Sequence, residues 1–481
     1  VAGEAGADPV SQTAGGLFTF TASFVSDDGS NGLPTITSDI TINGNGSTLD
    51  LGGSGVGIRL AQISGSGDLT VNDATISDGS MFDATFGGGI FRVDGGDLTL
   101  NDSTLTDSAT RSYGGAVFGL DGATLTITDS TLSGNQAFRG GAVYGSDSTV
   151  TLTNSTLSGN TANRSGAGVQ VNGGDLSISG GIIEANGWEP GQIGTTGYVD
   201  YGGGVFAHRA SVNISGTVIR GNYGGYAGGG GVRLSNVTDA LIDDATIPGN
   251  TAGSGGGVSL GAYNDGAIFP VTGVIRDSVI DGNTATWYGG GVTLIAGSTV
   301  SILRTTISNN VAENNFGNSA GGGVANFLSD LTIEQSTLAD NNANNGGGLL
   351  ASNYSYYGNG DGSTTVTNTT ISGNTATGFG GGVMLMASPV ATLNNVTISD
   401  NEAQDGGGLA FYNEQADANT GSGTLNRTLI VGNSASENGD EVLAENATLT
   451  ANNFNLFGHN GINNASALAG FTPGATDITA T

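Results

Sequence analysis

Cysteine and lysine are both missing from this chain of 481 residues. Without cysteine there are no disulfides, no zinc–thiolate sites and no cysteine nucleophile. The 11 basic residues are all arginines, against 42 acidic residues, and the formal net charge is −31. So few cations give no basic stripe for nucleic acid or for an anionic membrane, and we expect neither as a partner. A strongly acidic surface suits an extracellular or saline setting.

Long apolar runs and helical periodicity are missing as well. No apolar run approaches the roughly 18 residues that a membrane-spanning helix needs, so we expect no transmembrane segment. No stretch repeats its apolar residues with the period of a helix. Proline is scarce, with 7 residues, which suits uninterrupted strand ladders because proline removes a backbone donor.

Glycine is abundant instead, with 89 residues, and it falls at a fixed phase of a repeated unit. The clearest copies are GGAVFGLDGATLTITDSTLSGNQA from Gly114 and GGAVYGSDSTVTLTNSTLSGNTA from Gly140. The unit of about 26 residues holds a glycine run, a valine or isoleucine, an alternating L-x-I segment and S-T-L-S-G-N. A fixed period of this length is typical of stacked repeat architectures.

Alternation within the repeat predicts strands rather than helices. Leu125, Ile127 and Leu132 are apolar, with Thr, Asp or Ser between them, as expected of strands with one buried face. Each repeat is predicted to hold three short strands that pair in parallel with those of the next coil. The fold class is therefore predicted to be all-β: a right-handed parallel β-helix of about fourteen coils, because parallel crossovers are right-handed.

Both ends of such a solenoid expose sheet edges, which need capping segments. We place the β-helix over residues 34–458. Residues 1–33 are predicted to form an N-terminal tail and a cap strand over Leu17–Val25. Residues 459–481 are predicted to form a C-terminal tail and a cap over Asn464–Phe471.

An asparagine recurs three residues after the last strand position of most repeats. Amides at equivalent positions of neighbouring coils can bond to one another, so we expect a structural asparagine ladder at this turn. Its predicted members are Asn135, Asn160, Asn186, Asn222, Asn250, Asn283, Asn310, Asn341, Asn374, Asn401 and Asn433.

Aromatic residues gather near the glycine runs and in the longer loops that interrupt the period. They can form a track on which sugar rings stack, or an aromatic ladder that covers the glycine runs and packs on itself. We favour the packing interpretation, and both can hold. The candidates for contact with a carbohydrate or partner are Trp188, Tyr198, Tyr201, Tyr226, Trp287, Tyr288, Tyr263, Tyr356 and Tyr412.

Three sets of residues invite a catalytic or metal-binding role. A glycosidase needs two carboxylates facing one cleft, but adjacent residues on a strand point to opposite faces and loop carboxylates are commonly solvated. The sets are Asp243 with Asp244; the loop residues Asp265, Asp361 and Asp417; and Arg209, Arg220 and Arg233. His208 and His459 lie far apart in coil number. We therefore predict no catalytic set, no metal site and no cofactor.

The recurring GGGV…LTI…STLSGNTA pattern resembles the right-handed β-helix repeats of bacterial surface proteins. These include chlamydial polymorphic outer-membrane-protein-like repeats and large exported proteins with a pectin-lyase-like fold. Most copies here have Leu or Ile before S-G-N, where the chlamydial pattern has Phe. The segments LPTITSDITINGNGSTLDL and FNLFGHNG…GFTPGATDIT resemble the start and end segments of the exported proteins. The resemblance implies a secreted adhesin, passenger or matrix component.

These observations lead us to expect a non-catalytic structural or adhesive β-solenoid, secreted or held at a bacterial cell surface. Its expected partners are extracellular glycans and further copies of itself, since solenoid edges can stack end to end into a fibre. Two alternatives stay open on the same scaffold. One is a polysaccharide-active enzyme, a lyase or a glycosidase, and the other is a carbohydrate-binding module.

Overall fold

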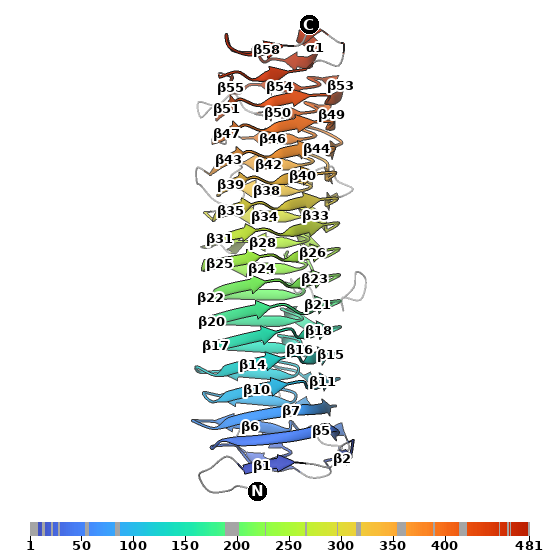
Figure 1. Cartoon of the computed structure of the whole chain (residues 1–481), viewed down its shortest axis with the longest axis vertical. Coiled ribbons are helices and arrows are strands. Elements are labelled where there is room, and N and C mark those ends of the chain that lie inside the picture. The colour runs from blue at the N-terminus through green and yellow to red at the C-terminus, as the bar shows by residue number, and fades with distance from the viewer. Residues whose placement is uncertain are drawn as a thin grey trace. The chain divides into compact units, whose positions relative to one another are not determined.

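In the computed structural model, parallel β-strands account for nearly all of the regular secondary structure of the described residues (Figure 1). The structure describes residues 8–11, 15–20, 23–26, 29–52, 57–81, 87–187, 202–226, 228–264, 267–295, 297–313, 319–353, 362–387, 390–412, 421–451, 453–458, 461 and 463–479. The predicted right-handed parallel β-solenoid is confirmed, with about 14 coils in all. The chain divides into unit 1, Val1–Ala227, and unit 2, Gly228–Thr481, and each unit is described by itself.

One coil contains four strand positions, of which the sequence predicted three. In unit 1 these are the Gly-run strand β13 (Val117–Leu120), the L-x-I strand β14 (Thr124–Thr128) and the S-T-L strand β15 (Thr131–Ser133). A fourth strand, β16 (Gln136–Arg139), follows them. It escaped prediction because it buries only Ala137, and one inward residue gives no alternation to recognise.

Unit 1 stacks these positions coil on coil, and its longer strands cover two positions each. The Gly-run stack holds β6 (Ala61–Ser64), β9 (Phe91–Asp94), β13, β17 (Val143–Thr153), β20 (Val169–Ser179) and β22 (Val205–Ser215). The L-x-I stack holds β1 (Asp8–Ser11), β5 (Ile40–Asp50), β7 (Asp68–Ser77), β10 (Asp97–Asn101), β14, β17, β20 and β22. The S-T-L stack holds β2 (Leu17–Thr19), β5, β7, β11 (Thr104–Thr106), β15, β18 (Thr156–Ser158), β21 (Ile182–Glu184) and β23 (Val218–Arg220). The fourth stack holds β8 (Ser80–Met81), β12 (Ala109–Thr110), β16 and β19 (Thr161–Ser165).

Unit 2 repeats the plan. Its Gly-run stack holds β24 (Val232–Ser235), β28 (Val258–Leu260), β34 (Val292–Ile295), β38 (Val324–Phe327), β42 (Leu349–Ser352), β46 (Val383–Met386), β50 (Leu409–Tyr412), β54 (Val442–Glu445) and β57 (Leu468–Ala469). Its L-x-I stack holds β25 (Val237–Asp243), β31 (Val271–Arg276), β35 (Thr299–Leu303), β39 (Asp330–Glu334), β43 (Ser363–Thr367), β47 (Val390–Asn394), β51 (Ser422–Asn426) and β55 (Thr448–Ala451).

The remaining strands of unit 2 lie in two further stacks. The S-T-L stack holds β26 (Thr246–Pro248), β32 (Val279–Asp281), β36 (Thr306–Ser308), β40 (Thr337–Ala339), β44 (Thr370–Ser372), β48 (Thr397–Ser399), β52 (Leu429–Val431), β56 (Leu456–Phe457) and β58 (Ile478–Thr479). The fourth stack holds β27 (Thr251–Ser254), β33 (Thr284–Tyr288), β37 (Val311–Ala312), β41 (Asn342–Ala343), β45 (Thr375–Ala376), β49 (Glu402–Asp405) and β53 (Ser434–Asn438). Two antiparallel hairpins complete the strands: β3 (Phe24–Ser26) with β4 (Gly29–Asn31) in unit 1, and β29 (Ala262–Asn264) with β30 (Ala267–Phe269) in unit 2.

The interior of each coil is apolar, as the alternation predicted. Leu125 and Ile127 of β14 and Leu132 of β15 are fully buried. In-register pairing places Leu98 of β10 and Val150 of β17 beside Leu125. Stacking like on like therefore carries a continuous apolar core from coil to coil within the unit.

Two local features let the chain turn so tightly. Asp129 adopts a left-handed φ of 48° between β14 and β15, a conformation that Asp and Asn tolerate. Ser130 then points inward; its hydroxyl accepts from the backbone N–H of Ser103 at 3.0 Å and donates to the carbonyl of Thr128 at 2.7 Å. In the glycine run, a side chain on Gly115 would collide with the carbonyl of Gly141 in the next coil. The inward hydroxyl of Ser130 thus satisfies backbone groups at its turn, and the packing around Gly115 leaves no room for a side chain.

Strand pairing extends past both boundaries that we placed on the β-helix. Before residue 34, β1 and β2 pair in parallel with β5, and β2 covers the first part of the predicted cap strand. Beyond residue 458, β57 and β58 pair in parallel with β54 and β56. A single turn of helix, α1 (Asn464–Ala467), precedes β57, and Asn463 caps it by accepting from the backbone N–H of Ser466 at 3.1 Å.

Candidate functional site

The asparagines of unit 1 are joined by hydrogen bonds through successive coils. Asn160 is fully buried. Its Nδ2 donates to Oδ1 of Asn186 in the next coil at 3.0 Å and to the carbonyl of Leu132 in the preceding coil at 2.9 Å. Its own Oδ1 accepts from the backbone N–H and from Nδ2 of Asn135, both at 3.0 Å. One side chain thereby ties three coils together and leaves no free donor or acceptor for a ligand.

Unit 2 contains the same arrangement, and it ends on a carboxylate. The bonds run from Asn250 through Asn283, Asn310, Asn341, Asn374 and Asn401 to Asn433. Nδ2 of Asn433 then donates to Glu441 Oε2 at 2.6 Å, and the N–H of Gly432 donates to Oε1 at 3.0 Å. Burial raises the pKa of Glu441, while the hydrogen bonds from Asn433 and Gly432 oppose part of that rise. A carboxylate accepts only, so it ends the ladder.

The aromatic contact candidates are scattered by the fold. Trp188, Tyr198, Tyr201 and Tyr356 lie outside the described residues, and so does the side chain of Tyr263. Tyr226 of unit 1 is exposed, with 67% of its surface accessible. Trp287 and Tyr288 end β33 and are half-buried, and Tyr412 ends β50.

In unit 2 the described rings pack on one another. Tyr288 meets Phe327 edge to face with ring centroids 4.8 Å apart, and Phe379 stacks on Tyr412 at 4.9 Å. They cover a row of small and apolar side chains on the outer face of the Gly-run strands, from Ala325 to Leu443. Rings that cover one another offer little free face to a sugar, so these contacts support the packing interpretation for Tyr288 and Tyr412.

In unit 1 the same corner contains arginines, which the sequence analysis did not single out. We call the residues Arg111–Tyr113, Phe138–Arg139 and Asn163–Ser165 the arginine corner. They lie in three successive coils, just before the glycine run of each. Tyr113 and Arg139 occupy paired positions of adjacent coils. An arginine within three residues of the glycine run in three consecutive repeats was the signal that could have revealed this corner.

Aromatic contacts order the arginine corner. Tyr113 stacks on the buried Tyr144 with ring centroids 4.8 Å apart and lies 5.7 Å from Phe118. The guanidinium of Arg139 lies over the ring of Phe138, 5.9 Å from its centroid. Burial raises the pKa of the Tyr144 hydroxyl, so it stays protonated. Within the corner, Tyr113 and Arg139 are thus held against neighbouring rings.

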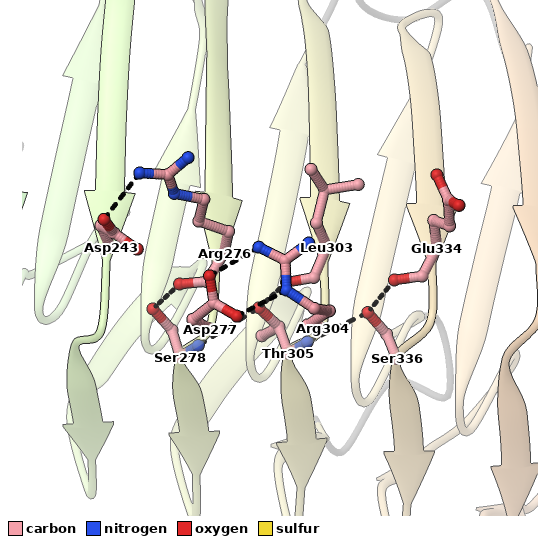
Figure 2. Close-up of polar contacts among 9 residues, drawn as sticks. All are labelled: Asp243, Arg276, Asp277, Ser278, Leu303, Arg304, Thr305, Glu334 and Ser336. Carbon is pink, nitrogen blue, oxygen red and sulfur yellow. Dashed lines mark hydrogen bonds and ion pairs between the residues drawn. The ribbon is translucent and has the colours of Figure 1, made fainter.

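Three arginines outside this corner pair with carboxylates of a neighbouring coil: Arg220, Arg276 and Arg304. In unit 2, Arg276 of β31 bonds Asp243 of β25 at 2.8 Å, and Arg304 holds Asp277 through two bonds of 2.7 Å (Figure 2). The hydrogen bond from Arg276 lowers the pKa of Asp243, and the one from Arg304 lowers that of Asp277. Both carboxyls stay ionised at neutral pH, which makes them poor proton donors.

The remaining catalytic candidates are not brought together. Asp244 lies at the bend after β25 with φ of 50°, beside the paired Asp243. Asp265, Asp361, Asp417 and His459 lie outside the described residues. Arg220 pairs with Glu184 at 2.6 Å in unit 1, whereas the buried Arg233 contacts Ser259 in unit 2. Arg209 and the half-buried His208 are both residues of β22.

Neither a metal-binding cluster nor a membrane-spanning helix occurs within the described ranges. No group of three or more His, Asp or Glu side chains is placed there to hold a metal ion. No helix in those ranges has the length and apolarity to cross a membrane.

Comparison with known proteins supports the fold and gives no evidence of function. A family profile described as "Right handed beta helix region" matches residues 115–311, a stretch that begins just after Arg111–Tyr113 and includes the rest of the arginine corner and the ion pairs of Arg276 and Arg304 in unit 2. Searches of curated proteins and of solved structures found no significant match. The chain is therefore similar to right-handed β-helix proteins over that stretch, and its function has to be argued from its own residues.

Proposed function

We propose that this chain is a non-catalytic structural and adhesive β-solenoid that works outside a bacterial cell. The observation that carries the proposal is the side-chain ladder inside each unit. Asn160, Asn310 and their equivalents spend every donor and acceptor on bonds between coils. A coil tied in this way is suited to hold its shape under load, and its lateral corners are left to contact partners.

The composition supports an extracellular setting. A net charge of −31 with no lysine and no cysteine gives a surface that stays soluble in salt. The absence of thiols removes the residues most sensitive to oxidation. The resemblance of the repeat to bacterial surface proteins points the same way.

Assembly of copies end to end extends the proposal. The first and last strands of the S-T-L position carry exposed apolar side chains: Leu17 of β2 is 69% exposed and Ile478 of β58 is 59% exposed. Strand edges with apolar side chains associate readily, and a head-to-tail contact repeats without closing.

Electron microscopy of the purified chain over a concentration series tests the structural role. We expect rods that join end to end into fibres as the concentration rises, with a constant axial repeat. Isolated particles at every concentration would remove the fibre from the proposal. Compact particles without a rod shape would contradict the structural role itself.

A further inference from the structure

We propose that Asn45 is a modification site: its side-chain amide is lost spontaneously to give aspartate and isoaspartate, and this change loosens the first coil of unit 1. Asn45 and Gly46 lie in the middle of β5, at the bend between its L-x-I half and its S-T-L half. The inference goes beyond the proposed scaffold role and does not depend on it.

The reaction joins Asn45 to the residue that follows it. The backbone nitrogen of Gly46 attacks Cγ of Asn45, the bond between Cγ and Nδ2 breaks, and ammonia leaves with the proton of the Gly46 nitrogen. Water then opens the cyclic imide at either carbonyl, which gives aspartate or isoaspartate. Water is consumed and ammonia released, so the step needs no oxidant and no enzyme. Glycine favours the attack because it has no side chain to shield its nitrogen.

The bend at Asn45 and Gly46 lies outside the strand pairing that holds most of the unit. Pairing of β5 with β7 stops at Asn43 and resumes at Ser47. Asn45 has φ of 50° and Gly46 has φ of 74°, and both residues are exposed. A side chain built on Gly46 would meet no atom within 4 Å. Few neighbours therefore resist the movement that brings the Gly46 nitrogen to Cγ of Asn45.

Other Asn-Gly pairs share this sequence but have a different backbone environment. In four pairs the glycine N–H donates to a carbonyl of a neighbouring coil at 2.7–3.0 Å, and in two more the glycine is buried. The bonded glycines are Gly32, Gly187, Gly346 and Gly439, and the two others are Gly44 and Gly173. Within the described ranges, Asn45–Gly46 is the one Asn-Gly pair with both residues exposed. A bonded or buried nitrogen must first be released by local opening, so we expect the other pairs to react more slowly.

The first coil is attached to β5 at this bend. The carbonyl of Asn45 accepts from the backbone N–H of Gly15 at 3.1 Å, and the N–H of Thr48 donates to the carbonyl of Gly16 at 2.9 Å. Isoaspartate routes the main chain through the former side chain, which adds a methylene and turns the Asn45 carbonyl into a carboxylate outside the main chain. The bond from Gly15 is then displaced.

Either product also adds a negative charge to a row of carboxylates. Asp73, Asp102 and Asp129 occupy the same bend in the next three coils, with φ of 50°, 49° and 48°. Asn45 is the neutral residue at the head of this row. Like charges on adjacent strands destabilise their pairing. Both effects fall where β1 and β2 pair with β5, so modification should weaken the first coil and leave later coils unchanged.

Peptide mapping by mass spectrometry on the full chain tests the site. The chain is kept in mildly alkaline buffer, and electron-transfer fragmentation distinguishes asparagine, aspartate and isoaspartate at each pair. We expect Asn45 to be converted at least about tenfold faster than Asn345 or Asn438, whose glycines are bonded. The chain unfolded in urea is the matched control, in which these pairs should react at similar rates. Equal rates in the folded chain would overturn the inference.

Hydrogen exchange on the aged chain tests the consequence. We expect exchange in β1 and β2 to become about tenfold faster once Asn45 is converted, with no change in β14 or β15. Asn45→Asp supplies the charge without isoaspartate and should reproduce part of the increase. Asn45→Gln keeps an amide but must form a larger ring, so it should age with little change. Unchanged exchange in β1 and β2 after conversion would overturn the loosening of the first coil.

These outcomes are separate from those of the proposed function. A folded chain in which Asn45 stays intact overturns this inference and leaves the structural role standing. Compact particles without a rod shape in electron microscopy would contradict the structural role and leave the modification site standing.

Discussion

The corner that precedes the glycine run differs between the two units, although the asparagines beneath it are bonded in the same way. In unit 1 it carries Arg111, Arg139 and Arg164 in three successive coils. In unit 2 the corresponding strands carry aromatic or acidic residues, such as Tyr288 in β33 and Asp405 in β49. Asp405 accepts from Nδ2 of Asn438 in the next coil at 2.8 Å, so even this acid is tied to the coil stack.

The difference shows which positions are constrained. A ladder asparagine touches the coils on both sides, so changing it leaves buried groups of two neighbours unpaired. A corner residue touches solvent and one or two rings, so it can change sign without loss of the fold. We infer that the interior specifies the scaffold and the corner specifies what each unit contacts.

Breaking the shared interior should have the largest effect, and an equal one in both units. Asn160→Ala and Asn310→Ala each strip partners from buried groups in two neighbouring coils. We expect each to lower the free energy of unfolding of its unit by about 3–5 kcal/mol. Denaturant titration followed by hydrogen exchange, which localises the loss to one unit, is the measurement.

Asn101→Ala is the matched control for both variants. Asn101 donates to Asn72 at 2.9 Å in a similar amide pair, but on the outer surface and only part-buried. Replacing Asn101 by alanine should lower the free energy of unfolding by about 0.5–1 kcal/mol. An outer variant as damaging as the inner ones would contradict the special place of the interior ladder.

The carboxylate that ends the ladder of unit 2 should give stability a pH dependence. Because burial raises the pKa of Glu441, the folded chain holds this proton over a range where the unfolded chain has lost it. Stability from this group is therefore highest below the ordinary carboxyl pKa of about 4.3 and falls as pH rises through the raised folded value.

Glu441→Gln should remove that slope. The amide keeps one acceptor for Asn433 but turns an N–H toward the donor of Gly432, so we expect a loss of about 2 kcal/mol at low pH. Thermal unfolding of both proteins across pH 3–8 is the measurement. If the unfolding midpoints of the two proteins change with pH in parallel, Glu441 is not the source of the pH dependence.

Removing one corner ring should have a moderate effect, confined to one unit. Tyr113→Ala deletes the ring that stacks on Tyr144, and Phe379→Ala deletes the one that stacks on Tyr412. Each variant should lower the free energy of unfolding of its own unit by about 1–2 kcal/mol. Faster hydrogen exchange in that unit is the measurement. Faster exchange in the unit that keeps its ring would contradict a local effect.

The exposed ion pairs should matter least. Arg304 and Asp277 are both more than 40% exposed, and such pairs add little to stability. With the pKa of Asp277 lowered by Arg304, the contribution is present above the ordinary Asp pKa and is lost as pH falls through the lowered value. In Arg304→Gln, an NMR titration should find the pKa of Asp277 shifted upward, with hardly any change in unfolding midpoint. An unchanged pKa would show that the pair does not form in solution.

The period of the repeat predicted the features that its copies share, namely the buried apolar positions and the ladder asparagine. Leu125 and Ile127 recur as apolar pairs in most coils, and in-register stacking buries them as predicted. The position of Asn160 could be read in the same way, since nearly every copy has an asparagine there. A parallel solenoid brings equivalent positions together, so the repeat alone implies these contacts.

Features that only a few copies of the repeat carry could not be predicted from its period. The arginine corner depends on three neighbouring coils, and the pair of Arg304 with Asp277 depends on which residue the preceding coil presents. Strand β16 of the fourth stack has one inward residue, and nothing in the polar run around Ser130 indicates that its hydroxyl points inward. Contacts set by the identity of one neighbour, rather than by the repeat, required the three-dimensional structure.

An incubation that would reveal cleavage of a polysaccharide fragment tests the central claim of a non-catalytic scaffold most directly. The purified chain is incubated with tri-galacturonate, and mass spectrometry of the bound and free sugar reports its length. Our account predicts that all of the sugar is recovered intact at every time point. Shortened or unsaturated products that accumulate with time in the wild-type sample would contradict a non-catalytic scaffold.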